Sequence, residues 1–151
     1  MESKEYAGFW IRVGASLIDM ILIVILLTIP LSMIYGQEYW TGSRFIYGFW
    51  DVMLGYVAPF IATIWLWRRF CATPGKMATN LRVVDAATGQ RMSVWQAVGR
   101  YFAYLVAVLP FGLGIIWVGI DKKKQGWHDK LAGTVVIRET GKVPVQFESE
   151  M

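Results

Sequence analysis

Two long apolar runs dominate the first half of the chain and predict membrane-spanning helices. The first covers residues 13–31 and ends near Tyr35 and Gly36, and the second covers residues 45–67. At about 1.5 Å per residue, each run is long enough to cross a hydrocarbon core of about 30 Å. Pro59 lies inside the second run and is expected to kink that helix, because proline removes a backbone donor.

A third apolar run, residues 98–120, is interrupted in its middle between Pro110 and Gly114. A full third span would place outside the cell every cation that follows the run, against the positive-inside rule. We therefore favour a re-entrant or interfacial helical hairpin that turns at Pro110–Gly114, with a third full span as the alternative. The cations concerned are Lys122, Lys123, Lys124, Lys130, Arg138 and Lys142.

The polar segment between the second and third runs shows local structural signals of its own. Residues 80–85 are rich in β-branched side chains, and a turn sequence ending at Gly89 follows them. We expect a short cytoplasmic β-like hairpin over about residues 80–92. Ser93 is then a suitable N-cap for a helix that starts at Val94. The predicted fold class is an all-α membrane protein with two transmembrane helices, the broken third segment and this small hairpin.

Composition places the chain in a lipid bilayer. Of the 151 residues, 56% are hydrophobic and eight are tryptophan, and the mean hydropathy is +0.43. A soluble core of this size could not bury so much apolar surface. Two spans and a hairpin also enclose little volume, so we expect a homo-oligomer or a partner membrane protein.

Orientation follows from the lysine and arginine residues in the loops. The first loop holds a single cation, Arg44, whereas residues 68–97 hold five. This asymmetry predicts that the N-terminus and the central loop face the cytoplasm. Lys122, Lys123 and Lys124 are also well placed to contact anionic lipid headgroups. The five cations of the central loop are Arg68, Arg69, Lys76, Arg82 and Arg91.

Asp19 is the most unusual residue of the first apolar run. A carboxylate at bilayer depth costs about 2.5–3.5 kcal/mol on insertion scales. Helical periodicity places Arg12, Ser16 and Asp19 on one face, which must meet protein or water rather than lipid. Such a face is typical either of a solute or proton site or of a structural polar lock between helices.

The partner of Asp19 must come from another element. Arg12 and Asp19 are about 10 Å apart along a regular helix, too far for direct contact. We therefore predict that Arg100 or the segment 127–130 satisfies Asp19. This segment contains His128, the single histidine, beside Asp129. His128 could serve as a proton relay or pH sensor, or as a structural hydrogen-bonded imidazole.

Several kinds of chemistry are missing from the sequence. The single cysteine permits no intramolecular disulfide, and no cluster has the spacing of a metal site. No nucleophile–base pair or paired carboxylates occur at usable spacing. Gly75 and Lys76 lack the glycine and hydroxyl residue of a phosphate loop, since Phe70 and Met77 stand there. We expect no enzyme activity, cofactor, metal or nucleic-acid partner.

Three segments together resemble the RDD family of small bacterial membrane proteins. They are GFWIRV (residues 8–13) leading to Asp19, TPGK (73–76) followed by LRVVD (81–85), and WHDKLAGTVV (127–136). The family is named for an arginine and an aspartate in its first helix and a later aspartate. These match Arg12, Asp19 and Asp129, with Asp121 a weaker match for the last. The resemblance implies one domain over residues 1–138, multi-pass in the bacterial cytoplasmic (inner) membrane, and residues 139–151 read as a flexible tail.

The resemblance implies little about activity, although transport, including cation/proton exchange, has been suggested for such proteins. Two hypotheses follow. The first, which the sequence favours, is small-solute or cation/proton transport that uses Asp19, with Arg12, Asp129, Arg100 and His128 along the path. The second is a non-catalytic accessory or scaffold subunit of a membrane complex, in which Arg12, Asp19 and Asp129 form a structural polar lock.

Overall fold

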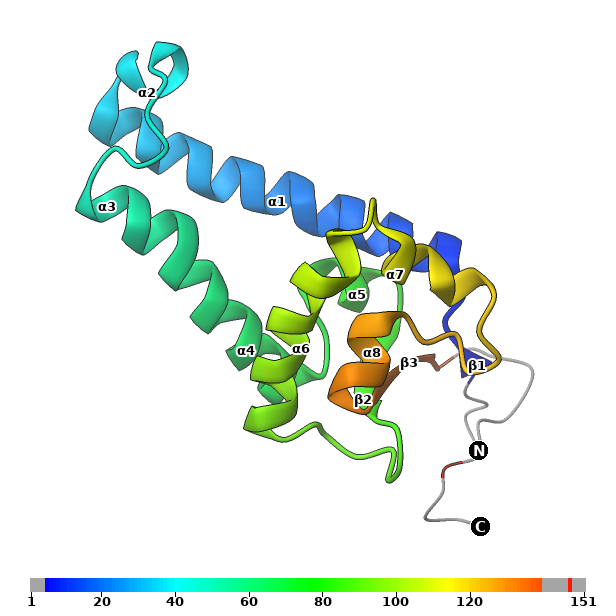
Figure 1. Ribbon diagram of the computed structural model, residues 1–151. Coiled ribbons are helices and arrows are strands. Elements are labelled where there is room, and N and C mark those ends of the chain that lie inside the picture. The colour runs from blue at the N-terminus through cyan, green and yellow to red at the C-terminus, as the bar shows by residue number, and fades with distance from the viewer. Residues whose placement is uncertain (1–4, 140–146, 148–151) are drawn as a thin grey trace.

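The computed structural model describes residues 5–139 and 147. Helix α1 (Phe9–Tyr35) ends where the sequence predicts, at Gly36, whose φ of 63° suits glycine. Two helical stretches, Phe9–Tyr35 and one within Phe49–Ala78, are long and apolar enough to cross a membrane. In Figure 1, α2 (Glu38–Thr41) and α3 (Phe49–Val52) lie at the C-terminal end of α1, and the remaining elements extend toward its N-terminal end.

The second span is a succession of three helical segments. After α3 come the π-helix η1 (Met53–Val57) and α4 (Ala58–Phe70). The amide of Ala58 bonds to the carbonyl of Met53, five residues back, directly before Pro59. This π-turn ends directly before Pro59, which has no amide hydrogen to donate. The short helix α5 (Pro74–Ala78) follows.

The third apolar segment is broken, as predicted. Helix α6 (Val94–Val108) begins directly after Ser93, which forms the expected cap: its hydroxyl accepts from the Gln96 amide at 3.1 Å. Then α7 (Leu113–Ile116) and the 3-10 helix η2 (Trp117–Gly119) follow at an angle of 110° to α6. The piece after the bend is about 10 Å long, too short to cross a bilayer.

A three-stranded antiparallel sheet has the order β1-β3-β2, formed by β1 (Glu5–Tyr6), β2 (Leu81–Asp85) and β3 (Thr134–Arg138). The strand expected after residue 80 is present, but its partner is β3 and not the returning segment 90–92. Only one backbone bond, from Asp85 to Gln90, links that return to the strand. Strand β3 is the better partner because it is β-branched and buries its side chains.

The sheet fixes where the chain segments meet. It joins the residues before α1, the loop between α4 and α6, and the residues after α7 at one end of the molecule. The two flanks of the broken third segment therefore lie together, as the hairpin prediction requires. Of the expected tail 139–151, only Glu139 and Phe147 are described, and the other positions lie outside the described residues. Phe147 is buried against Val84, Val135 and Ile137.

Helix α6 has the reverse of a soluble helix pattern, and this orientation directs its one arginine inward. Its large apolar side chains Trp95, Phe102 and Leu105 are exposed. Its buried face carries small residues and Arg100. Helix α8 (Trp127–Ala132) packs against this buried face. Large apolar residues outside and small or polar residues inside are typical of helices in lipid.

Candidate functional site

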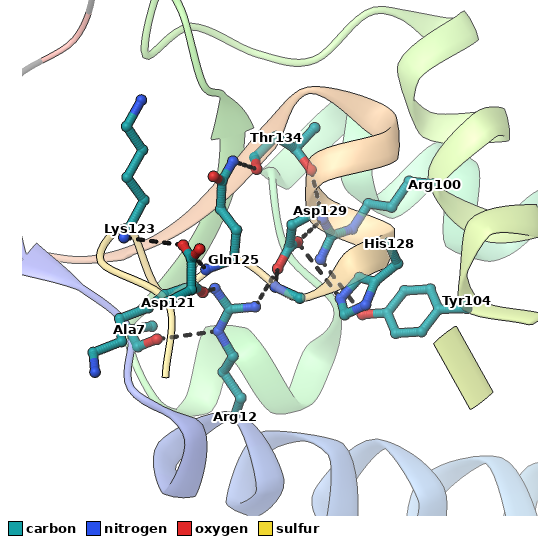
Figure 2. Close-up of polar contacts among 12 residues, drawn as sticks. Ala7, Arg12, Arg100, Tyr104, Asp121, Lys123, Gln125, His128, Asp129 and Thr134 are labelled. Carbon is teal, nitrogen blue, oxygen red and sulfur yellow. Dashed lines mark hydrogen bonds and ion pairs between the residues drawn. The ribbon is translucent and has the colours of Figure 1, made fainter. Parts of the chain in front are cut away.

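Asp129 is the centre of a buried polar cluster at the N-terminal end of α8. Its carboxylate is fully buried. One oxygen, Oδ2, accepts from Arg12 Nη1 at 2.6 Å and from the Gly126 amide at 3.0 Å. The other, Oδ1, forms an ion pair with Arg100 Nη1. Figure 2 shows the two guanidinium groups approaching this carboxylate from different helices. We call Asp129, Arg12 and Arg100 the Asp129 lock.

Arg12 connects three parts of the chain through one guanidinium group. It lies in the first turns of α1 and is 9% exposed. Besides Asp129, it donates through Nε to the carbonyl of Ala7 at 3.1 Å and through Nη2 to the carbonyl of Lys124 at 2.5 Å. The planar fork of arginine is suited to several acceptors at once. Arg12 thereby holds the start of α1 against α8 and the loop before it.

Arg100 enters the cluster from α6 and is fully buried. Its Nη1 also donates to the Thr134 hydroxyl at 2.6 Å, and its Nη2 to the Tyr104 hydroxyl at 3.4 Å. The guanidinium carbon lies 5.4 Å from the centre of the Trp67 ring and 5.5 Å from that of Tyr104. Aromatic faces stabilise a desolvated cation, so the surroundings of Arg100 combine ionic and ring contacts.

His128 stacks on Tyr104, with ring centres 4.0 Å apart and an angle of 19° between the planes. Burial, followed by the charge of Arg100, lowers the pKa of His128 from 6.5 to about 3. Burial alone would raise the pKa of Asp129, but Arg100 and Arg12 outweigh it and hold that pKa well below 3.8. At neutral pH His128 is therefore neutral and Asp129 ionised. A proton relay would need a pKa nearer the ambient pH.

Asp19 lies outside this cluster and is bound by a different element. Its carboxylate accepts from the Thr73 hydroxyl at 2.5 Å and from the Gly75 amide at 2.7 Å. The prediction that Asp19 is satisfied from outside its own helix is confirmed, but the predicted donors, Arg100 and segment 127–130, are wrong. Arg100 is committed to Asp129, and the first amides of α5 need an acceptor that their own helix cannot supply.

Gly75 allows α5 to approach α1 closely enough for this contact. A Cβ atom at this position would lie 2.0 Å from the carbonyl oxygen of Ala15, on the backbone of α1. No side chain fits there without moving one helix relative to the other. The glycine of the TPGK segment is therefore explained by packing rather than by phosphate binding.

Asp121, the alternative for the second acidic position, has a separate role. Its carboxylate accepts from the amides of Lys123 at 3.0 Å and Gln125 at 3.1 Å, and pairs with Lys130 at 2.6 Å. It anchors the turn before α8, whereas Asp129 forms the ion pairs with both arginines. Across residues 5–139 and 147, no group of three or more His, Cys, Asp or Glu side chains could hold a metal ion.

Several contributors to these contacts were not predicted as site residues, among them Tyr104, Thr134, Thr73 and Gly75. Tyr104 follows Arg100 by four positions, so helical spacing already places it on the same face. Thr134 closes the WHDKLAGT segment but carries no pattern that marks it as a partner of Arg100. Thr73 and Gly75 precede and open a helix that starts with proline, and such a start signals a need for capping.

Comparisons with known proteins identify the family of the chain. The model of the RDD family matches residues 6–133. "Uncharacterized protein YxaI" of Bacillus subtilis (strain 168) is 32% identical over 150 residues, which cover 89% of this chain and 98% of that protein. "Uncharacterized membrane protein YteJ" of the same organism is 30% identical over 148 residues, covering 91% and 84%.

A third relative, "Uncharacterized protein RP437" of Rickettsia prowazekii (strain Madrid E), is 34% identical over 82 residues. This match covers 54% of the chain but only 44% of the Rickettsia protein, so it spans less than half of that relative's length. No solved structure matches the chain. The matched region 6–133 contains Arg12, Arg100 and Asp129, and the chain belongs to the RDD family of membrane proteins.

Proposed function

We propose that this protein is a non-catalytic accessory or scaffold subunit of a membrane complex, with a core that fixes its membrane helices against the surface sheet. The observation that carries the proposal is the saturation of Asp129. Both of its oxygens are occupied by donors, and the residue has no exposed surface. The hypothesis of a structural polar lock is thus supported for Arg12 and Asp129, whereas Asp19 forms a separate contact.

Cation or proton transport is the second candidate, and Asp19 is the residue that favours it. Asp19 lies within the first candidate span and keeps partial exposure, unlike Asp129. A transported cation would have to compete with the Thr73 hydroxyl and the Gly75 amide for its carboxylate. These donors are neutral, so the competition costs less than displacing an arginine from Asp129. The accessory role is preferred because Asp19 already has its partners.

We also propose a membrane location, a lipid contact and a protein partner for this chain. The cations of the central loop support a bacterial cytoplasmic membrane location with the N-terminus and the sheet in the cytoplasm. The exposed Lys122 and Lys123, with Lys124 beside them, are proposed to contact anionic lipid headgroups. The partner in the complex is proposed to be another membrane protein or a second copy of this chain, since the two spans enclose little volume.

Reconstitution into liposomes separates the two roles. The purified protein is inserted into vesicles that contain a pH-sensitive dye, and proton movement is followed after addition of sodium or potassium. An accessory subunit should give the same rate as protein-free vesicles. In parallel, the thermal stability of Asp19→Asn and of the unmodified protein is measured in detergent.

Glu38→Gln is the matched control, because it removes one negative charge from an exposed position in the first loop. Cation-dependent proton flux in the unmodified protein that survives Glu38→Gln but disappears in a folded Asp19→Asn variant would establish transport and reject the accessory role. Absence of flux, with a modest loss of stability in Asp19→Asn alone, is the result we expect.

A further inference from the structure

A cavity of about 220 Å³ lies between α1, α5, α6, α7 and α8, next to the Asp129 lock. Its polar lining includes Arg12, Lys76, Tyr104 and His128. The rest of its wall is mainly apolar and belongs largely to α1. The cavity therefore has one polar, positively charged part and one apolar part, and the apolar part lies mainly along the candidate span α1.

Lys76 is the feature of this cavity that the fold leaves unexplained. The residue is 6% exposed, and within the described part of the chain its ammonium group makes no hydrogen bond or ion pair. A buried lysine is rare unless it is paired, because desolvating an ammonium ion is costly. Lys76 nevertheless brings three N–H donors and a positive charge to the cavity wall.

The side chains around the cavity also carry more positive than negative charge. Arg12 and Arg100 share the single carboxylate of Asp129, and among the described residues Lys76 has no carboxylate within ion-pair distance. The other nearby acid, Asp19, is bound by Thr73 and Gly75, and even if it is counted the cations outnumber the carboxylates. A desolvated excess of positive charge creates a favourable position for an anion.

The apolar wall indicates what the anion is attached to. Leu17 and Met20 line the cavity and are 53% and 62% exposed, so they border its open side. Both lie on the candidate span α1, where the surroundings of an exposed apolar side chain are acyl chains. A ligand with its charge at Lys76 can therefore continue past these residues into lipid.

We propose that this cavity binds the phosphate group of an anionic phospholipid, with Lys76 as its main ligand and the positive charge of Arg12 in support, while the acyl part leaves past Leu17 and Met20. A volume of about 220 Å³ suits a phosphate with its glycerol group rather than a complete lipid. The acyl chains would therefore lie outside the cavity, beyond its open side. This site is separate from the exposed Lys122 and Lys123, which face the surface. It does not depend on whether the protein is a scaffold or a transporter.

The test compares three additions to the detergent-solubilised protein: phosphatidylglycerol, phosphatidylcholine and inorganic phosphate. Thermal unfolding is measured in each, because a ligand that binds only the folded state raises the melting temperature. Native mass spectrometry counts the lipid that stays bound. Phosphatidylglycerol should raise the melting temperature and remain bound, and the other two should do so little or not at all.

Lys76→Met removes the charge and keeps an unbranched side chain of similar length. Without lipid, this variant should melt at a higher temperature than the unmodified protein, because the unpaired buried charge is gone. With phosphatidylglycerol, its affinity should fall about tenfold or more. Lys122→Met is the matched control, since it removes an exposed lysine and should keep the full lipid effect. Lys76→Arg should keep it too.

A second readout needs no variant. His128 lines the cavity, and as the single histidine it gives one set of ring signals in nitrogen NMR. Phosphatidylglycerol should shift these signals and phosphatidylcholine should not. Equal effects of the two lipids, an equal effect of inorganic phosphate, or an unchanged lipid response in Lys76→Met would each overturn the proposal.

Discussion

Two carboxylates hold α1 to the rest of the molecule, and they do so by different physical means. Asp129 approaches Arg12 from α8, has no exposed surface, and is balanced by two arginines. Asp19 extends from α1 itself, keeps partial exposure, and is satisfied by one hydroxyl and one amide. The more deeply buried charge has ionic partners, and the other needs only neutral donors. For these two carboxylates, the deeper burial of Asp129 goes with the ionic partners that a fully desolvated charge needs.

The comparison also shows how one helix face can serve two contacts. Arg12 and Asp19 lie on the same stripe of α1, as the periodicity predicts, but Arg12 binds α8 whereas Asp19 binds α5. Their charges do not meet. The stripe is therefore a row of separate attachment points along one helix, and each can be broken without directly removing the other.

The largest effect is expected when each of the two carboxylates is replaced by an amide, and the larger loss of stability should occur at Asp129. Asp129→Asn leaves Arg12 and Arg100 without their counter-charge and should lower the free energy of unfolding by about 3–5 kcal/mol. Asp19→Asn keeps one acceptor oxygen and should cost only about 1 kcal/mol. Unfolding in mixed micelles, followed by circular dichroism, measures both. Equal losses in the two variants would show that the two sites do not differ in this way.

A smaller effect should follow from changing the approach of α5 to α1. In Gly75→Ala the new methyl group meets the backbone of Ala15, which cannot rotate away, so a loss of about 1–3 kcal/mol is expected. Gly14→Ala, on the same helix α1, meets nothing within 4 Å and should instead stabilise by up to about 1 kcal/mol. The melting temperatures of the two variants, each compared with that of the unmodified protein, measure these changes. A neutral Gly75→Ala would contradict the close contact.

The smallest effect concerns pH. The pKa of His128 is about 3 in the folded protein and 6.5 as the reference value, so the unfolded chain binds this proton first as pH falls. Stability is fully present above pH 6.5 and decreases below it, by about 1 kcal/mol between pH 6.5 and 5.5. The lowered pKa of Asp129 acts only below about 3.8. His128→Phe keeps a ring against Tyr104 and should remove this pH dependence, as melting curves at both pH values would reveal.

Much of the fold could be predicted because membrane segments leave strong local signals. The end of α1 at Gly36, the Ser93 cap and the break around Pro110 each depend on nearby residues alone. The partner of β2 depends on residues about fifty positions away, and local turn signals favoured the nearer segment. Strand β3 was missed although its Thr-Val-Val-Ile run is rich in β-branched residues.

Most residues of the candidate site were predicted, but the contacts between them were not. Arg12, Arg100, His128 and Asp129 do come together, whereas the acid expected to join them, Asp19, does not. The prediction sought the polar partner that a carboxylate at this depth needs in Arg100 or in segment 127–130. A backbone amide freed by the start of α5 meets that need as well, and nothing in the spacing of charged residues shows this. Lys76 was treated as a cytoplasmic charge within the TPGK segment, and its burial was not predicted, because that burial depends on how α5 lies against α1.

The order of strands in the sheet has a consequence for biosynthesis. The central strand β3 is made last, and both β1 and β2 bond to it and not to each other. Until residues 134–138 have left the ribosome, β1 and β2 have no strand to pair with, and unpaired edges of this kind are prone to aggregation. Arg12 and Arg100 likewise have no counter-charge from Asp129 until that residue has been synthesised. The spans can enter the membrane early, but a chain that stops before residue 134 cannot complete the sheet that joins its two ends.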